Sequence, residues 1–231
     1  MTSFYTRSEW GAAPPRNTPN PIYGPKGMVV IHHTVTAYPD SPATAQDNLR
    51  TIQSWHQNGN GWNDIGYNHI IGCGDSYEGR GWGIVGAQAE GYNSQSHGIA
   101  VLMDGSAQEP HMQDLQAIAD TIRAGIAAGW VDASQLQVVC HGDLNSTACP
   151  GSLRGYIGKI VELVNGGGGM TPTQEMVTAM YRKWAFRDPD PEGLAYWSKQ
   201  IDSGAVPAEY VKQSLIDAEG WTRLAQAAGL A

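Results

Sequence analysis

The first 165 residues alternate between hydrophobic patterns typical of strands and patterns typical of helices. Strand-like runs are predicted at 27–32, 67–71, 99–103 and 136–141. Apolar residues at helical spacing predict helices at 43–56, 112–128 and 153–164. Ser41 and Pro42 suit a helix start, and Gly129 suits a helix end. Strands that interleave with helices predict an α/β fold, in which helices cover a central sheet.

A glycine-rich segment divides the chain. Four consecutive glycines within 165–169 predict a flexible linker, because glycine holds regular structure only at a high entropic cost. The linker would separate an α/β domain at 1–164 from a small all-α domain at 170–231. Helices of the second domain are predicted at 173–186, 192–203, 208–217 and 219–228.

Composition and charge narrow the range of partners. Hydrophobic residues make up 41% of the chain and charged residues 16%, which indicates a globular protein. With a net charge of −8 and no basic stripe to neutralise phosphates, we expect no nucleic-acid partner. No run approaches 18 apolar residues, which predicts no membrane span. The polar first residues are unlike a signal peptide, so we expect the protein to accumulate in the cytoplasm of the cell that makes it.

His141 and Cys149 are the most informative pair of residues. A predicted strand ends at His141, and the loop to Cys149 is long enough to turn back, so that an imidazole and a thiolate can meet. Such donors suit Zn²⁺. A catalytic zinc needs a third ligand, and the best donor is the apolar strand that ends in His32 and His33. Two histidines and one cysteine would leave one coordination position for water.

The same residues also have a purely structural interpretation. A histidine at a strand end is most often a hydrogen-bonded structural residue, and a single cysteine is most often a small buried apolar group. Neighbours in a regular strand point to opposite faces, so only one of His32 and His33 can be a ligand. Their apolar neighbours do not decide which one it is.

The chain also carries five motifs in order: RSEWGA (7–12), VIHHT (30–34), GYNHIIG (66–72), YEGRGW (77–82) and, after His141, TACPG (147–151). In order and spacing they resemble the zinc amidases shared by peptidoglycan recognition proteins and phage lysozymes of the amidase type. The resemblance runs from about residue 7 to about residue 164. It implies a mixed central sheet, one Zn²⁺ per chain, and hydrolysis of the amide between N-acetylmuramic acid and L-alanine in bacterial peptidoglycan.

The resemblance also implies roles for individual residues. His32, His141 and Cys149 would hold the zinc, and His33 would support the site or the core. Tyr67 would orient water or hydrogen-bond the tetrahedral intermediate, whereas packing would be the default role of such a tyrosine without the resemblance. Thr147 would donate a hydrogen bond to the oxyanion.

A further group is expected to contact the substrate, because aromatic rings suit sugars and amide groups suit peptide backbones. Gln88 stands where many relatives have histidine. Arg80 is expected to meet a peptide carboxylate or to anchor a loop, and His97 to line the groove or to pack in the core. The expected substrate-binding residues are Trp62, Arg80, Trp82, Gln88, Tyr92, Asn93 and His97.

Three functions fit these motifs. The first is a phage endolysin, a monomer released by a holin, whose helical domain would engage the wall or the substrate; its residues 187–197 resemble a small domain of uncertain function. The second is a non-catalytic peptidoglycan-binding protein of the same fold, which typically lacks a ligand. The third is a cytoplasmic amidase that recycles muropeptides. The presence of all three candidate ligands favours an enzyme.

Overall fold

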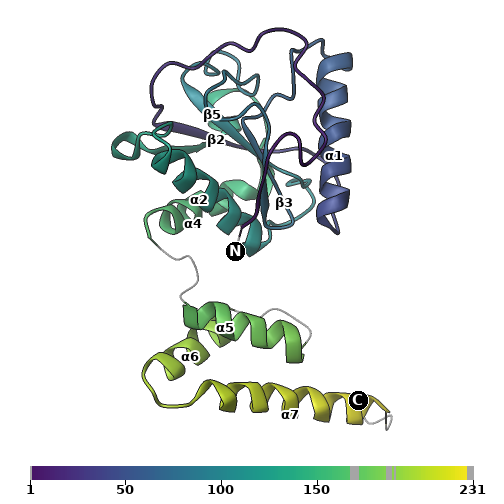
Figure 1. Ribbon diagram of the computed structural model, residues 1–231, viewed down its shortest axis with the longest axis vertical. Helices are drawn as coiled ribbons and strands as arrows, with labels where there is room; N and C mark the ends of the chain where they lie inside the picture. Colours follow the sequence, from purple (N-terminus) through teal and green to yellow (C-terminus); the bar gives the residue numbers. More distant parts are fainter. Residues whose placement is uncertain (1, 167–171, 186–188, 190, 228–231) are drawn as a thin grey trace. The chain divides into compact units, whose positions relative to one another are not determined.

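The structure is a computed structural model that describes residues 2–166, 172–185, 189 and 191–227. It divides into two compact units, Met1–Gly169 and Met170–Ala231. The first unit contains a sheet with helices on both sides, and the second consists of helices (Figure 1). Residues 167–169 of the predicted linker lie outside the described residues. No helix in the described parts is long and apolar enough to cross a membrane.

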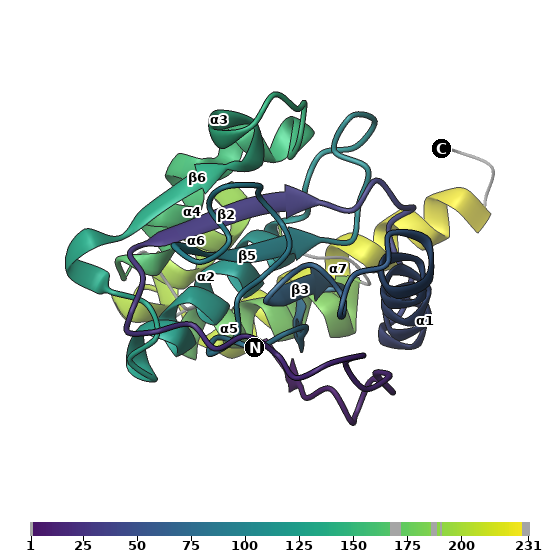
Figure 2. The ribbon, with the colours of Figure 1, turned by 90° about the horizontal axis from the view of Figure 1, so that it is seen from above.

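Six strands form one mixed sheet in the first unit, in the order β1-β4-β3-β5-β2-β6. Figure 2 shows β6, β2, β5 and β3 of this sheet in that sequence. β4 runs antiparallel to β3, and the other neighbouring pairs are parallel. β2 and β5 are inner strands and are buried almost throughout, as expected for strands covered on both faces. The strands are β1 (Phe4–Tyr5), β2 (Met28–His33), β3 (His69–Gly72), β4 (Asp75–Glu78), β5 (Ser96–Val101) and β6 (Gln137–Cys140).

Helices cover both faces of this sheet (Figure 1). On one face, α1 (Pro42–Ser54) packs against the sheet through a core that includes Leu49 and Ile70. On the other face, α2 (Met112–Ala127) and α4 (Ile157–Val164) share a larger core with β2 and β5. The predicted α/β fold with a mixed central sheet is therefore confirmed.

The strand alternation of β2 separates the two adjacent histidines. Val29 and Ile31 belong to the core under α2 and α4. His33 follows them on that face, and His32 points to the opposite face. His33 Nδ1 accepts a hydrogen bond of 2.8 Å from the backbone N–H of Gly105, so its structural role is clear.

Several predicted strands have different ends in the structure. The strand predicted at 67–71 begins only at His69, and the one predicted at 99–103 is β5, which begins at Ser96. β6 ends at Cys140, because the short helix α3 (His141–Leu144) starts there: the Cys140 backbone N–H donates to Asp143 Oδ2 at 2.8 Å. β1 and β4 were not predicted, since they are short and carry no apolar alternation.

Two predicted helices also differ in their details. The first starts as predicted, with the Ser41 side chain accepting a hydrogen bond from the Thr44 backbone N–H at 3.2 Å. It ends at Ser54 and continues as a π-helical turn, Trp55–Gly59. The helix predicted at 153–164 begins with a 3₁₀ segment, Gly151–Tyr156, before α4.

The second unit, taken by itself, has a small core of Val177, Tyr181, Val211 and Leu215. Its helices are α5 (Pro172–Met180), followed by a π-helical turn (Tyr181–Ala185), α6 (Pro191–Asp202) and α7 (Ala208–Ala227). The two helices predicted at 208–217 and 219–228 are one continuous helix. A single glycine inside a helix costs only about 1 kcal/mol relative to alanine, and Gly220 does not interrupt α7.

Two histidines are buried in the core of the first unit, against Trp82. The ring centroids of His69 and His97 lie 4.4 Å and 4.8 Å from the Trp82 ring. Both ring nitrogens of His69 and Nδ1 of His97 are buried without a hydrogen-bond partner in the described structure. Burial lowers the pKa of His69 to about 3 and the pKa of His97 to about 4, so both are neutral at pH 7.

We predict that these two histidines make the protein sensitive to acid. Their folded pKa values lie below the ordinary value near 6.5, so the unfolded chain binds more protons as the pH falls below 6.5. The free energy of unfolding should fall in this window by up to about 1.4 kcal/mol per pH unit for each histidine. Urea unfolding between pH 8 and pH 4.5 should show a smaller loss for His69→Phe than for the wild type. Parallel curves for the two proteins would contradict the prediction.

Candidate metal centre and active site

Three side chains that can hold a metal meet where β2 and β6 end. They are His32 from β2, His141 at the start of α3, and Cys149 from the loop that follows. One ligand atom from each lies within 4.8 Å of the other two. His32 Nδ1 is 3.7 Å from Cys149 Sγ, and the ring centroids of His32 and His141 are 4.5 Å apart. The structure therefore brings together the three ligands that the resemblance implied.

Strand pairing and one glycine explain this convergence. β2 and β6 are parallel neighbours, and Ile31 pairs with Cys140, so the next residue of each chain segment, His32 and His141, lies at the same edge of the sheet. The Gly142 backbone N–H donates to the Cys149 carbonyl at 2.8 Å and closes the loop. A Cβ atom at position 142 would lie 2.5 Å from the Thr147 carbonyl oxygen, so this closure requires glycine.

The electrostatics of the three side chains suit a metal of borderline softness. Burial, with a contribution from His141, lowers the pKa of His32 to about 3, and burial also lowers the pKa of His141. Both imidazoles are therefore neutral and have a free lone pair. Burial raises the pKa of the Cys149 thiol to about 11, so metal binding would release its proton. Two neutral imidazoles and one thiol, with no carboxylate among them, fit Zn²⁺.

Tyr67 and Thr147 lie next to these ligands. The ring centroids of Tyr67 and His32 are 5.3 Å apart. Burial, and then the neighbouring Cys149, raises the pKa of Tyr67, so its hydroxyl stays protonated at neutral pH. Thr147 is exposed, and its Oγ1 accepts a hydrogen bond of 3.2 Å from the Cys149 backbone N–H. That bond leaves the hydroxyl proton of Thr147 available to a ligand.

A row of rings extends from Tyr67 to the surface. His56 lies between Tyr67 and Trp62, with centroid distances of 5.8 Å and 4.7 Å. Its other neighbour, Trp55, is 5.5 Å away. Trp62 is 36% exposed and Trp55 is 63% exposed, so the row of rings ends in two tryptophans that solvent can reach. Sequence reasoning missed His56, because nothing in the helical pattern distinguishes it from the last residue of a helix.

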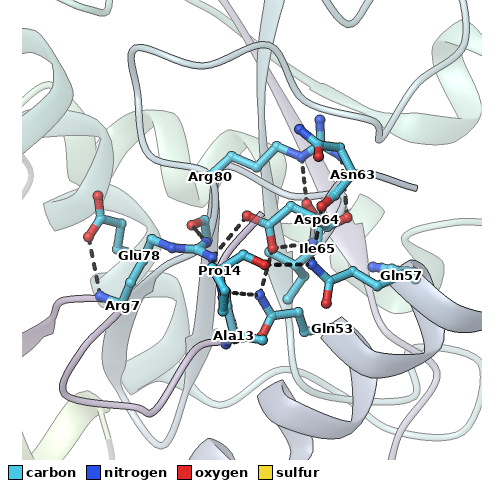
Figure 3. Close-up of polar contacts among 12 residues, drawn as sticks. Arg7, Ala13, Pro14, Gln53, Gln57, Asn63, Asp64, Ile65, Glu78 and Arg80 are labelled. Carbon is cyan, nitrogen blue, oxygen red and sulfur yellow. Dashed lines mark hydrogen bonds and ion pairs between the residues drawn. The ribbon is translucent and has the colours of Figure 1, made fainter. Parts of the chain in front are cut away.

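Arg80 anchors neighbouring loops, which is one of its two expected roles (Figure 3). Its guanidinium donates to the backbone carbonyls of Ile65 at 2.6 Å, Val85 at 2.9 Å and Asp64 at 3.3 Å. The buried Asp64 side chain also forms an ion pair of 2.9 Å with Arg7. Ile65 and Asp64 precede Tyr67 by a few residues, so Arg80 fixes the segment that carries this tyrosine.

Other expected substrate contacts lie elsewhere in the structure. His97 is completely buried, and its Nε2 lies 3.2 Å from the Trp130 carbonyl oxygen; it cannot line a groove, because β5 starts at Ser96 and directs it into the core. Trp82 packs against it and against His69. Asn93 Oδ1 accepts hydrogen bonds from the backbone N–H groups of Gln88 and Ala89, and thereby holds a turn. Asn93 and Tyr92 remain partly exposed.

Gln88, one of the expected substrate-binding residues, contacts the candidate ligand His32. It is only 7% exposed. Its Oε1 lies 2.6 Å from His32 Nε2, and its amide nitrogen donates to Ser96 Oγ at 2.9 Å. Asp143, two residues after His141, accepts a hydrogen bond from the Cys140 backbone N–H and forms an ion pair with Arg154.

Comparison with solved structures defines the class of the first unit. Drosophila PGRP-LB is similar with a TM-score of 0.66 and 35% identity, over 68% of this chain and 93% of that one. Peptidoglycan recognition protein-LE, solved in complex with tracheal cytotoxin (monomeric diaminopimelic acid-type peptidoglycan), has a TM-score of 0.63 and 36% identity, over 66% and 89%. The first unit therefore has the fold of peptidoglycan recognition proteins.

Sequence comparison identifies the family. The family model described as N-acetylmuramoyl-L-alanine amidase matches residues 23–152, more than half of the chain. The chain belongs to this family. The N-acetylmuramoyl-L-alanine amidase of Sus scrofa is 37% identical over 153 residues, which are 64% of this chain but 25% of the pig protein. Peptidoglycan-recognition protein LB of Drosophila melanogaster is 37% identical over 149 residues, 63% of each chain.

We predict that Arg80→Lys lowers the stability of the first unit. Lysine cannot supply three donors in the plane of a guanidinium, so buried carbonyls lose their partners, at a cost of about 1–3 kcal/mol. Chemical denaturation should detect this loss. Arg16→Lys, at an exposed arginine, is the matched control and should change stability little. Equal stability of the two variants would show that the Arg80 contacts contribute nothing.

Proposed function

We propose that the protein is a zinc-dependent N-acetylmuramoyl-L-alanine amidase that hydrolyses the amide between N-acetylmuramic acid and L-alanine of bacterial peptidoglycan. The main support is the convergence of His32, His141 and Cys149 beside Tyr67. The names of several relatives, and the complex of peptidoglycan recognition protein-LE with a peptidoglycan monomer, support peptidoglycan as the substrate.

The roles of the side chains follow from their surroundings. His32, His141 and Cys149 would hold the zinc, which would supply a Lewis acid and a bound water whose pKa is lowered towards about 7. Amide hydrolysis also needs hydrogen-bond donors for the oxyanion. We assign this role to Tyr67, which is protonated and whose ring lies 5.3 Å from that of His32, and to Thr147, whose hydroxyl proton is free. Trp62 and Trp55 offer exposed aromatic faces to sugar rings.

The biological setting that we propose is a phage endolysin. The resemblance of the chain's motifs to those of phage amidases supports this setting. The second, helical unit would then engage the wall or the substrate. In this proposal the enzyme stays in the cytoplasm of the producing cell until a holin releases it. Comparison of the full chain with residues 1–164 in binding to purified sacculi tests the role of the second unit.

We predict that zinc and activity are lost together when a ligand is replaced. Cys149→Ser and His141→Ala should bind less than one zinc per chain by mass spectrometry and should release no L-alanine amino termini from purified walls. Cys140→Ser replaces the buried thiol next to His141, which is not among the converging ligands, and should retain both. An enzyme that remains fully lytic after exhaustive chelation would disprove zinc dependence.

We predict that loss of a hydroxyl donor lowers turnover but not zinc content. Removal of one oxyanion donor typically costs about 10²–10³ in kcat. Tyr67→Phe and Thr147→Ala should therefore have a kcat lowered by about this factor but still bind about one zinc per chain. Thr147→Ser keeps the hydroxyl and should have nearly the wild-type kcat. Zinc loss in Thr147→Ala would refute its role as an oxyanion donor.

The same assays separate the alternatives. A non-catalytic binding protein would retain zinc and bind sacculi but release no amino termini. A recycling amidase would cleave soluble muropeptides and leave intact sacculi unchanged, whereas an endolysin would cleave sacculi.

A further inference from the structure

His32 has one close polar partner besides the candidate ligands. Gln88 Oε1 lies 2.6 Å from His32 Nε2, and the two side chains are 7% and 1% exposed. The contact alone does not tell which atom carries the hydrogen, because a neutral imidazole nitrogen is either a donor or an acceptor. The neighbours of Gln88 resolve this question.

A chain of hydrogen bonds fixes the direction of the Gln88 amide. Ser96 Oγ lies 2.8 Å from the Tyr92 carbonyl oxygen, which can only accept, so the single hydroxyl proton of Ser96 points there. Ser96 must then accept from Gln88, and the group at 2.9 Å is the amide nitrogen. The Gln88 oxygen therefore faces His32, and His32 Nε2 carries the hydrogen. The lone pair of His32 is on Nδ1, which lies 3.7 Å from Cys149 Sγ.

Packing holds Gln88 in this position. A Cβ atom on Gly98 of β5 would lie 2.5 Å from Gln88 Cγ, so the glycine leaves the space that the glutamine side chain fills. The Gln88 backbone N–H donates to Asn93 Oδ1 at 2.7 Å. The side chain is thus fixed at both ends, by its backbone and by its amide.

We infer that Gln88 is a positioning residue that locks His32 in the Nε2–H tautomer and presents Nδ1 to the metal. This inference rests on the proposed zinc site. The amide oxygen accepts from Nε2 and prevents the ring from turning or exchanging its proton, so that the site is arranged before the metal arrives. Such hydrogen bonds orient metal-ligating histidines and raise metal affinity.

The first test is the tautomer of His32 in the metal-free full-length protein. Long-range ¹H–¹⁵N NMR of the imidazole should show the hydrogen on Nε2 in the wild type. In Gln88→Met, which has a similar shape but no acceptor for Nε2–H, the population of the Nε2–H form should fall below the wild-type value. A wild-type ring protonated at Nδ1 would overturn the inference.

The second test is zinc affinity, measured by competition with a chromophoric chelator. Gln88→Met should bind zinc about 10- to 100-fold more weakly than the wild type. Gln88→Glu keeps an acceptor oxygen and should stay close to the wild-type value. Gln53→Met makes the same change at another buried glutamine, which bonds to Ala13 and Asp64, and should not weaken zinc binding.

The outcomes distinguish this inference from the proposed function. A wild-type protein that binds no zinc would refute the proposed function. Tight zinc binding by both the wild type and a folded Gln88→Met would overturn only the role of Gln88. If Gln88→Met does not fold, Ser96→Ala tests the role of Gln88 instead. This variant keeps the glutamine but removes the acceptor of its amide nitrogen, so the amide can turn. It should lower both the Nε2–H population of His32 and the zinc affinity. Unchanged values in Ser96→Ala would then overturn the inference.

Discussion

The parallel pairing of β2 with β6 is the constraint on which the candidate metal site depends. The register pairs Ile31 with Cys140, and the first residue beyond each is a histidine that can ligate metal. A shift of one residue in β2 would turn His32 towards the α2 core and His33 towards Cys149. The apolar side chains of β2, such as Val29 and Ile31, are buried in that core and oppose such a shift. The hydrophobic core therefore fixes the ligand set.

Burial keeps several histidines neutral, with different consequences. His32 and the pair His69 and His97 all have lowered pKa values because they are buried. Only His32 has a thiol and a second imidazole within reach and an amide oxygen at its other nitrogen. His69 and His97 lie against a tryptophan and belong to no group of three possible metal ligands among the described residues, so we assign them to stability and not to metal chemistry. The partners of a histidine, more than its burial, determine its role.

Local pattern was enough for the fold class and for part of the site. The apolar runs located β2, β5 and β6, and the spacing of His141 and Cys149 pointed to a metal. The hydrophobic pattern did not choose between His32 and His33, because the residues of β2 that precede them are apolar on both faces of the strand. The choice depends on which of these faces packs against α2. The roles of three further residues were harder to predict, because their partners are distant in sequence. His97 contacts Trp130, Gln88 contacts His32, and Arg80 contacts the loop around Asp64. The local spacing of residues does not predict such contacts. For the same reason it did not predict that His56 lies between Trp62 and Tyr67.

The most direct test of the central claim is X-ray absorption at the zinc edge on the zinc-loaded protein. The account predicts one sulfur at about 2.3 Å, with the remaining ligands nitrogen or oxygen at about 2.0–2.1 Å. The sulfur signal should disappear in any zinc retained by Cys149→Ser. A spectrum with no sulfur in the wild type, or with several sulfurs, would contradict a site formed by His32, His141 and Cys149.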